Sequence, residues 1–129
     1  MLFLLASLCT FHASIIHAQA ASPSTDEIRS RIHETLRKQR SLKDFYSDIS
    51  TRFGQTALVP LTELATNIRE RDETRYASLY GLSRIGGEKS IPIVKKLFTD
   101  KSWMLRDAAI KNATAICARR SCAQDLSAY

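Results

Sequence analysis

The sequence predicts an all-α fold, an α-solenoid of antiparallel helix pairs with about six helices and a short C-terminal one. Residues 75–86 resemble residues 106–117, so one helical segment recurs 31 positions later. Apolar residues recur every three or four positions along most of the chain after residue 24. No long alternating strand pattern and no Asn-Gly or Asp-Gly hairpin turn occurs. These observations favour stacked helices over a sheet.

The repeat pairs residues of the same kind at most of its positions. The matched pairs are Arg75 and Arg106, Ala77 and Ala108, Leu79 and Ile110, Leu82 and Ala113, and Ile85 and Ile116. Because each unit leaves an apolar stripe uncovered, neighbouring units are expected to bury those stripes on each other.

Two helices are expected before the repeat. The first begins at a capping box formed by Ser24 and Glu27 and ends near Arg40. Its narrow apolar stripe consists of Ile28, Ile32 and Leu36. A second capping box at Ser41 begins a helix that ends at Gly54.

The later helices are placed by their caps and stops. Gly86-Gly87 closes one helix, and a turn at Asp100 precedes a helix expected over residues 103–118. The expected N-caps are Thr56, Asp72, Ser90 and Ser121. Trp103 is expected to pack over the preceding turn, with an exposed contact residue as the alternative.

The two units resemble HEAT-like repeats, the short variety also found in the phycobilisome lyase-like group. Arg75, the small residues after it and Ile85-Gly86 are similar to that group's second-helix pattern, although Cys117 stands in the second copy where the first has a glycine. The HEAT pattern of proline, turn aspartate and second-helix arginine is met by Pro92, Asp100 and Arg106. The resemblance implies a repeat domain over residues 41–129, clearest in units 56–87 and 89–118. A polar leader and an amphipathic helix precede it over residues 21–40.

Two arginines and two aspartates are expected to hold the repeats in register. Arg75 and Arg106 fall in the first turns of their helices, where each can bind a carboxylate or free carbonyls of a neighbouring unit. Asp72 and Asp100 are the expected acceptors. A ligand-binding role for either arginine is the alternative.

A basic segment over residues 29–43 is the candidate for anion binding in this chain, whose net charge is +6. Against Glu34 alone it carries six basic residues: Arg29, Arg31, Arg37, Lys38, Arg40 and Lys43. A solvated cap over one end of the solenoid is the expected role, and contact with an anionic partner or membrane surface is the alternative. No aromatic residues interleave with these charges, so nucleic-acid binding is not expected.

Residues 1–20 are typical of a secretory signal peptide, with an apolar core and a small-residue cleavage site at Ala18-Gln19-Ala20. The chain is therefore expected to be exported to a periplasmic or secreted location. An uncleaved membrane anchor is the alternative. In an oxidising compartment Cys117 and Cys122 are candidates for a disulfide, and two free thiols remain the other possibility.

No catalytic constellation is visible, so no enzyme activity, cofactor or metal is expected. His33, the one histidine after residue 20, is expected to be a surface residue on a solvated helix. The predicted function is an exported, non-catalytic scaffold that binds an unidentified protein partner. The alternatives are a small lyase or isomerase related to the phycobilisome group, and an anionic-ligand or membrane-surface binder acting through residues 29–43.

Overall fold

The structure is a computed structural model and describes residues 21–119, which form helices and connecting turns without a strand. The helices are α1 (Thr25–Arg37), α2 (Leu42–Phe53), α3 (Leu58–Thr66), α4 (Asp72–Gly86), α5 (Ile91–Lys96) and α6 (Trp103–Ala118). The prediction of an all-α fold is confirmed. The short helix expected from Ser121 lies outside the described residues.

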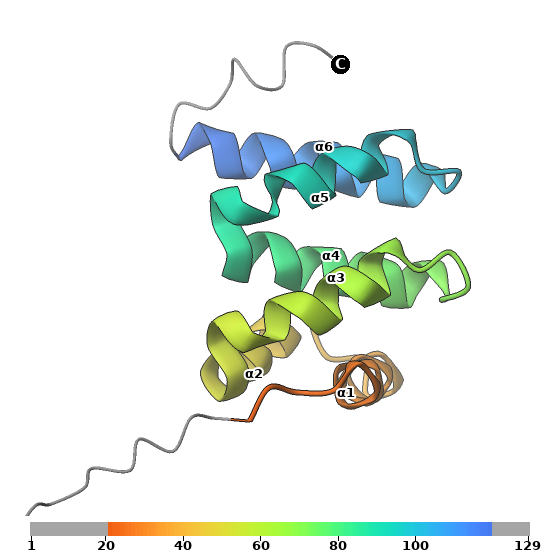
Figure 1. Cartoon of the computed structure of the whole chain (residues 1–129). Helices are drawn as coiled ribbons and strands as arrows, with labels where there is room; N and C mark the ends of the chain where they lie inside the picture. Colours follow the sequence, from red (N-terminus) through yellow and green to blue (C-terminus); the bar gives the residue numbers. More distant parts are fainter. Residues whose placement is uncertain (1–20, 120–129) are drawn as a thin grey trace, which may run out of the picture.

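The helices pack antiparallel and in layers. Figure 1 shows α3 beside α4 and α5 beside α6, with the second pair stacked on the first. Helix α1 is seen almost end-on below these layers, so it crosses the direction of the four later helices. The N-terminal helix thus closes one side of the stack without repeating its geometry.

The first two helices begin where their caps predict. The Ser24 hydroxyl oxygen accepts a hydrogen bond from the Glu27 backbone N–H at 3.1 Å. At the start of α2 the capping box is complete, because Ser41 and Asp44 each accept from the other's backbone. Helix α1 ends at Arg37, earlier than expected, and Gln39 then takes a left-handed φ of 52° that turns the chain toward α2.

Two expected caps, Thr56 and Asp72, are wrong, and Ser90 occupies the N-cap position of α5 without capping through its side chain. The chain enters α3 and α5 through 3-10 turns, Gly54–Ala57 and Gly87–Ser90, whose carbonyls already accept the first helical N–H groups. The Thr56 and Ser90 hydroxyls instead donate to the carbonyls of Phe53 and Gly87. Asp72 is the first residue of α4, after the N-cap residue Arg71.

Two glycines make the same connection at two levels of the stack. Gly54 after α2 has φ 50° and ψ −130°, and Gly87 after α4 has φ 51° and ψ −130°. Residues with a side chain rarely adopt this conformation, which explains the predicted helix stops at both sites. The recurring turn sends the chain from one layer into the next in the same way each time.

Two apolar clusters form the core, and α4 contributes to both. The lower cluster joins α1 and α2 to α3 and α4 through Ile28, Ile32, Phe45, Ile49, Ala57, Leu61, Leu64, Ala77 and Leu82. The upper cluster joins α3 and α4 to the last pair through Ala65, Leu79, Val94, Leu97, Leu105, Ala108, Ala109 and Ala113. Helix α4 therefore carries buried residues around most of its circumference.

Matched positions of the repeat differ in burial according to their layer. Ala77 and Ala108 are 1% and 3% exposed, so both face the interior. Leu79 is fully buried under the next layer, whereas its counterpart Ile110 is 51% exposed. Trp103 lies seven residues before Ile110 on α6 and is 71% exposed, so the expectation that it packs over the preceding turn is wrong. Among the described residues, no further layer covers this side of α6.

The difference between Leu79 and Ile110 predicts different effects of the same truncation. Leu79→Ala should lower the free energy of unfolding by about 2–5 kcal/mol, because it leaves a cavity between two layers. Ile110→Ala should change it by less than about 1 kcal/mol, since the side chain is already half in water. Urea denaturation followed by circular dichroism measures both; equal losses would contradict the layer assignment.

The glycine turns predict a purely conformational cost. Gly87→Ala should destabilise the fold by about 1–3 kcal/mol because of its backbone conformation. Apart from its neighbours in the chain, no atom lies within 4 Å of the added methyl group, so overlap with other segments does not contribute. Gly54→Ala is the matched control and should lose a similar amount in the same thermal or urea unfolding measurement. A neutral effect at both sites would refute this account of the turns.

Candidate functional site

Arg75 is the most deeply buried charged residue described, with 1% of its surface exposed. It lies in the first turn of α4, and its Nε donates to the Ala65 carbonyl at the end of α3 at 3.1 Å. Its Nη1 donates to Asp100 Oδ1 at 3.1 Å, and its Nη2 donates to Asp100 Oδ2. The guanidinium thus binds both oxygens of one carboxylate, which is the strongest geometry for this pair.

Asp100 belongs to the next layer, in the turn before α6. Its Oδ1 also accepts from the Ser102 backbone N–H at 2.9 Å. The hydrogen bond from Arg75 holds the pKa of this carboxyl below its ordinary value, the Ser102 N–H adds to that effect, and burial opposes it. The pair therefore joins the α3–α4 layer to the α5–α6 layer.

The other two predicted register residues are arranged differently. Arg106 donates from Nη1 to the carbonyls of Asp100 at 2.7 Å and Lys101 at 3.0 Å, both in its own layer. Asp72 accepts from the Ser102 hydroxyl at 2.6 Å, and its Oδ1 lies 3.7 Å from Arg75 Nη1. Arg106 makes no ion pair with a carboxylate of the described chain. Among the four predicted register residues, the ion pair that joins the two layers is therefore the one between Arg75 and Asp100.

In the folded chain, carboxylates neutralise part of the positive charge of residues 29–43. Arg29 pairs with Asp26 and Glu70, and Arg31 pairs with Glu27 and Asp48. Lys38 pairs with Glu34 at 2.6 Å. The remaining three cations, Arg37, Arg40 and Lys43, make no ion pair with a described residue. Half of the predicted anion-binding set is thus paired, and for Arg29 and Arg31 the carboxylates come from outside residues 29–43.

Two other positions predicted from the sequence, His33 and Cys117, lie away from the Arg75 network. His33 is exposed, and its Nε2 lies 3.4 Å from the Thr74 hydroxyl. Within residues 21–119, no three His, Cys, Asp or Glu side chains gather as metal ligands. Cys117 is 3% exposed near the end of α6, and Cys122 lies outside the described residues. The disulfide between them stays a prediction.

A groove along the surfaces of α4 and α6 was not predicted. One cavity, of about 370 Å³, lies between the C-terminal ends of the two helices. A second, of about 220 Å³, continues along them past Tyr76, Tyr80 and Asn112. Both cavities share Ser83, Arg84, Ile116 and Arg119, and we call this surface the α4–α6 groove. No spacing in the sequence pairs Arg84 with Arg119, so only the helix packing brings them together.

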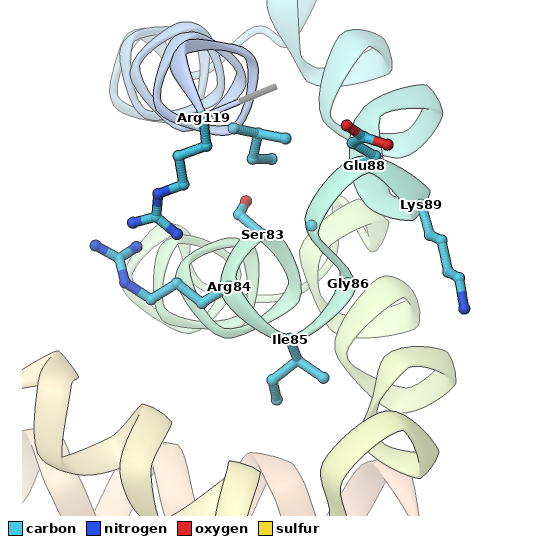
Figure 2. Close-up of a pocket in the computed structure, with 9 residues that line it drawn as sticks. Ser83, Arg84, Ile85, Gly86, Glu88, Lys89 and Arg119 are labelled. Atoms are coloured by element: carbon cyan, nitrogen blue, oxygen red, sulfur yellow. The ribbon is translucent and has the colours of Figure 1, made fainter. Parts of the chain in front are cut away.

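Charge and aromatic groups are concentrated in the groove. Arg84 places its Cζ atom 3.6 Å from the ring centroid of Tyr80, which is a close cation–π contact. Figure 2 shows the guanidinium groups of Arg84 and Arg119 pointing toward each other across the gap between the helices. Lys111 at the rim is paired with Asp107 at 2.7 Å. The groove therefore presents two guanidinium groups and an aromatic ring that a ligand can contact.

Comparison of the chain with models of protein families, with curated proteins and with solved structures finds no match. Among residues 21–119, no helix is long and apolar enough to cross a membrane. The predicted signal peptide, residues 1–20, lies outside the described residues, so export stays a prediction.

The pair between Arg75 and Asp100 predicts an acid-sensitive contribution to stability. Asp100→Asn removes the charge opposite a buried guanidinium and should lower the free energy of unfolding by about 3–5 kcal/mol at pH 7. Because the pKa of Asp100 is lowered on folding, its contribution is present above the unfolded value, about 3.9, and disappears as pH falls through the folded value.

The measurement is urea denaturation of the natural protein and Asp100→Asn between pH 7 and pH 2.5. The difference in unfolding free energy between the natural protein and the variant should shrink below about pH 4. Asp44→Asn, which weakens the exposed cap of α2, is the control and should cost about 1 kcal/mol at pH 7. A difference for Asp100→Asn that stays constant with pH would show that its charge does not stabilise the fold.

Proposed function

We propose that this protein is a short HEAT-like α-solenoid that acts as an exported, non-catalytic protein-interaction module. Its architecture supports the proposal: antiparallel pairs stack in layers, the same glycine turn connects the layers, and one arginine ties the two of them together. Repeat stacks of this kind present extended helical surfaces, and binding uses residues between the packing positions.

The observation that carries the proposal is the α4–α6 groove. Its two adjoining cavities run along both second helices of the repeat. Four of the residues that line it stand where the two copies differ: Tyr80 is matched by Lys111, and Arg84 by Ala115. A surface that varies between otherwise matched units is suited to recognition rather than to stacking.

The groove is favoured over residues 29–43 as the binding surface. Arg29, Arg31 and Lys38 already bind carboxylates of this chain, which reduces their attraction for an external anion. Tyrosine and arginine, by contrast, are the residues that most often dominate the energy of protein interfaces. These contacts favour binding of the proposed partner against α4 and α6.

Site-specific photocrosslinking in cells tests this placement. Ala115 is exposed in the groove and is replaced by p-benzoylphenylalanine, while Thr51, exposed on α2, is the control position. Crosslinking at residue 115 should yield one adduct whose second protein is then identified by mass spectrometry and purified. That protein should bind Tyr80→Ala about tenfold more weakly than the natural chain, because a central aromatic contact is lost.

Two results would contradict the proposal. Identical adducts from positions 115 and 51 would mean that the groove has no special role. Unchanged affinity of the identified protein for Tyr80→Ala would mean that the contact lies elsewhere. A Tyr46→Ala variant, on α2 and outside the groove, controls for general effects of losing a tyrosine and should bind normally.

A further inference from the structure

Two positively charged side chains, Arg84 and Arg119, point toward each other in the α4–α6 groove (Figure 2). Arg84 lies in the last turn of α4, and Arg119 directly follows α6. Figure 2 shows that their guanidinium groups approach each other over the cavity of about 370 Å³. Two like charges at close range repel each other, and the repulsion is greater where helices replace part of the surrounding water.

The described chain supplies no counter-charge to either group. Arg29, Arg31, Arg52 and Arg75 each have a carboxylate within 4.0 Å, but neither Arg84 nor Arg119 makes such a pair with residues 21–119. Glu88 also lines the cavity, yet Figure 2 places it on the wall away from the guanidinium pair. Each arginine gains about 0.3–1 kcal/mol from the helix end beside it. That gain explains each position separately but not the facing arrangement.

The groove also orients one of the two cations. The Tyr80 ring lies against the Arg84 guanidinium, with the ring centroid 3.6 Å from Cζ. Stacking covers the face of the guanidinium and leaves its N–H edges available for hydrogen bonds. The neighbouring Ser83 hydroxyl donates to the Leu79 carbonyl at 2.8 Å, so its hydrogen is already used inside α4. Figure 2 shows the guanidinium groups of Arg84 and Arg119 at this end of the cavity, and the Lys89 side chain points away from them.

We propose that Arg84 and Arg119 together bind a side-chain carboxylate of an acidic peptide segment. The inference rests on the proposed function and names the chemistry of the partner at that same groove. A carboxylate has two oxygens, so it can accept hydrogen bonds from both guanidinium groups at once. Its negative charge then offsets the repulsion between the two arginines. The second cavity, with Tyr76 and Tyr80, gives the residues beside the acidic side chain an aromatic surface to cover.

A peptide fits this recess better than a membrane or a nucleic acid does. The cavity lies between two helix ends, and its volume suits a few side chains rather than a lipid surface or a duplex. In addition, only two cations of the described groove, Arg84 and Arg119, face each other, and Lys89 points away from them (Figure 2), whereas binding to phosphate backbones draws on several.

The test uses the full chain and an end-blocked tetraglutamate peptide, observed through the Nε–Hε NMR signals of arginine. The signals of Arg84 and Arg119 should shift on addition of tetraglutamate and stay unchanged with tetraglutamine. Arg84→Gln and Arg119→Gln should each weaken the binding about tenfold, the loss of one charged hydrogen-bonding partner. Arg69→Gln removes the same charge at the α3–α4 connection, at the opposite end of the layers, and should bind normally (Figure 1).

Three outcomes would overturn the assignment. If Arg69→Gln weakened tetraglutamate binding as much as the groove variants do, the binding would reflect only general charge attraction. Shifts of the same size with inorganic phosphate would indicate a phosphate-bearing ligand instead of a peptide carboxylate. Unshifted arginine signals would mean that the pair binds no anion. If the residue 115 crosslink still identifies a partner that needs Tyr80, the interaction module stands and only its acidic recognition fails.

Discussion

The buried guanidinium of Arg75 is the constraint on which the stacking of this protein depends. A charge that is 1% exposed is tolerable only if nearly every donor has a partner. Those partners come from two layers: the Ala65 carbonyl ends α3, and the Asp100 carboxylate belongs to the turn before α6. The turn must therefore lie where Arg75 requires it, and α5 and α6 are positioned with it. Removing either partner of such a pair leaves the other charge buried and unpaired, which is costly.

Helix α4 can hold this position because its sequence admits close neighbours on several sides. Ala77, Ser78 and Gly81 are small and buried, and a methyl group at Gly81 would sit 3.4 Å from Leu61 and Phe45. The buried hydroxyls of Ser78 and Ser83 donate to carbonyls one turn earlier, so they add no unsatisfied donors. The two apolar clusters meet on this helix, and the lower and upper layers are coupled through it.

The packing that buries Arg75 and the apolar face of α4 leaves the groove-facing side of the same helix exposed. Tyr80 and Arg84 project from α4 beside the end of α6, where Arg119 meets them. Their positions are not those of the repeat pattern, and they take no part in the Arg75 network. The residues that hold the layers together are therefore different from those that line the groove proposed to bind a partner. This separation makes recognition through the groove compatible with a stable fold.

The sequence by itself determined the helical class, most helix boundaries and the residues that stack. Apolar spacing, capping boxes and the glycines at positions 54 and 87 act locally, so their effects can be predicted without knowing the fold. Local patterns also suggested that Arg75 would seek a turn aspartate. Local patterns failed where the outcome depended on a distant segment. Asp48 and Glu70 neutralise part of the basic segment, which its own sequence did not predict. Trp103 is exposed because no neighbouring element covers it in the described structure.

Only the tertiary structure decided which matched positions are covered and where cations face each other. Leu79 and Ile110 look equivalent in sequence, yet one lies under a layer and the other does not. Arg84 and Arg119 are 35 residues apart on different helices, and no periodicity relates them. Their proximity follows from how α4 and α6 end side by side. Burial and charge pairing depend on neighbours in space, which a local pattern does not contain.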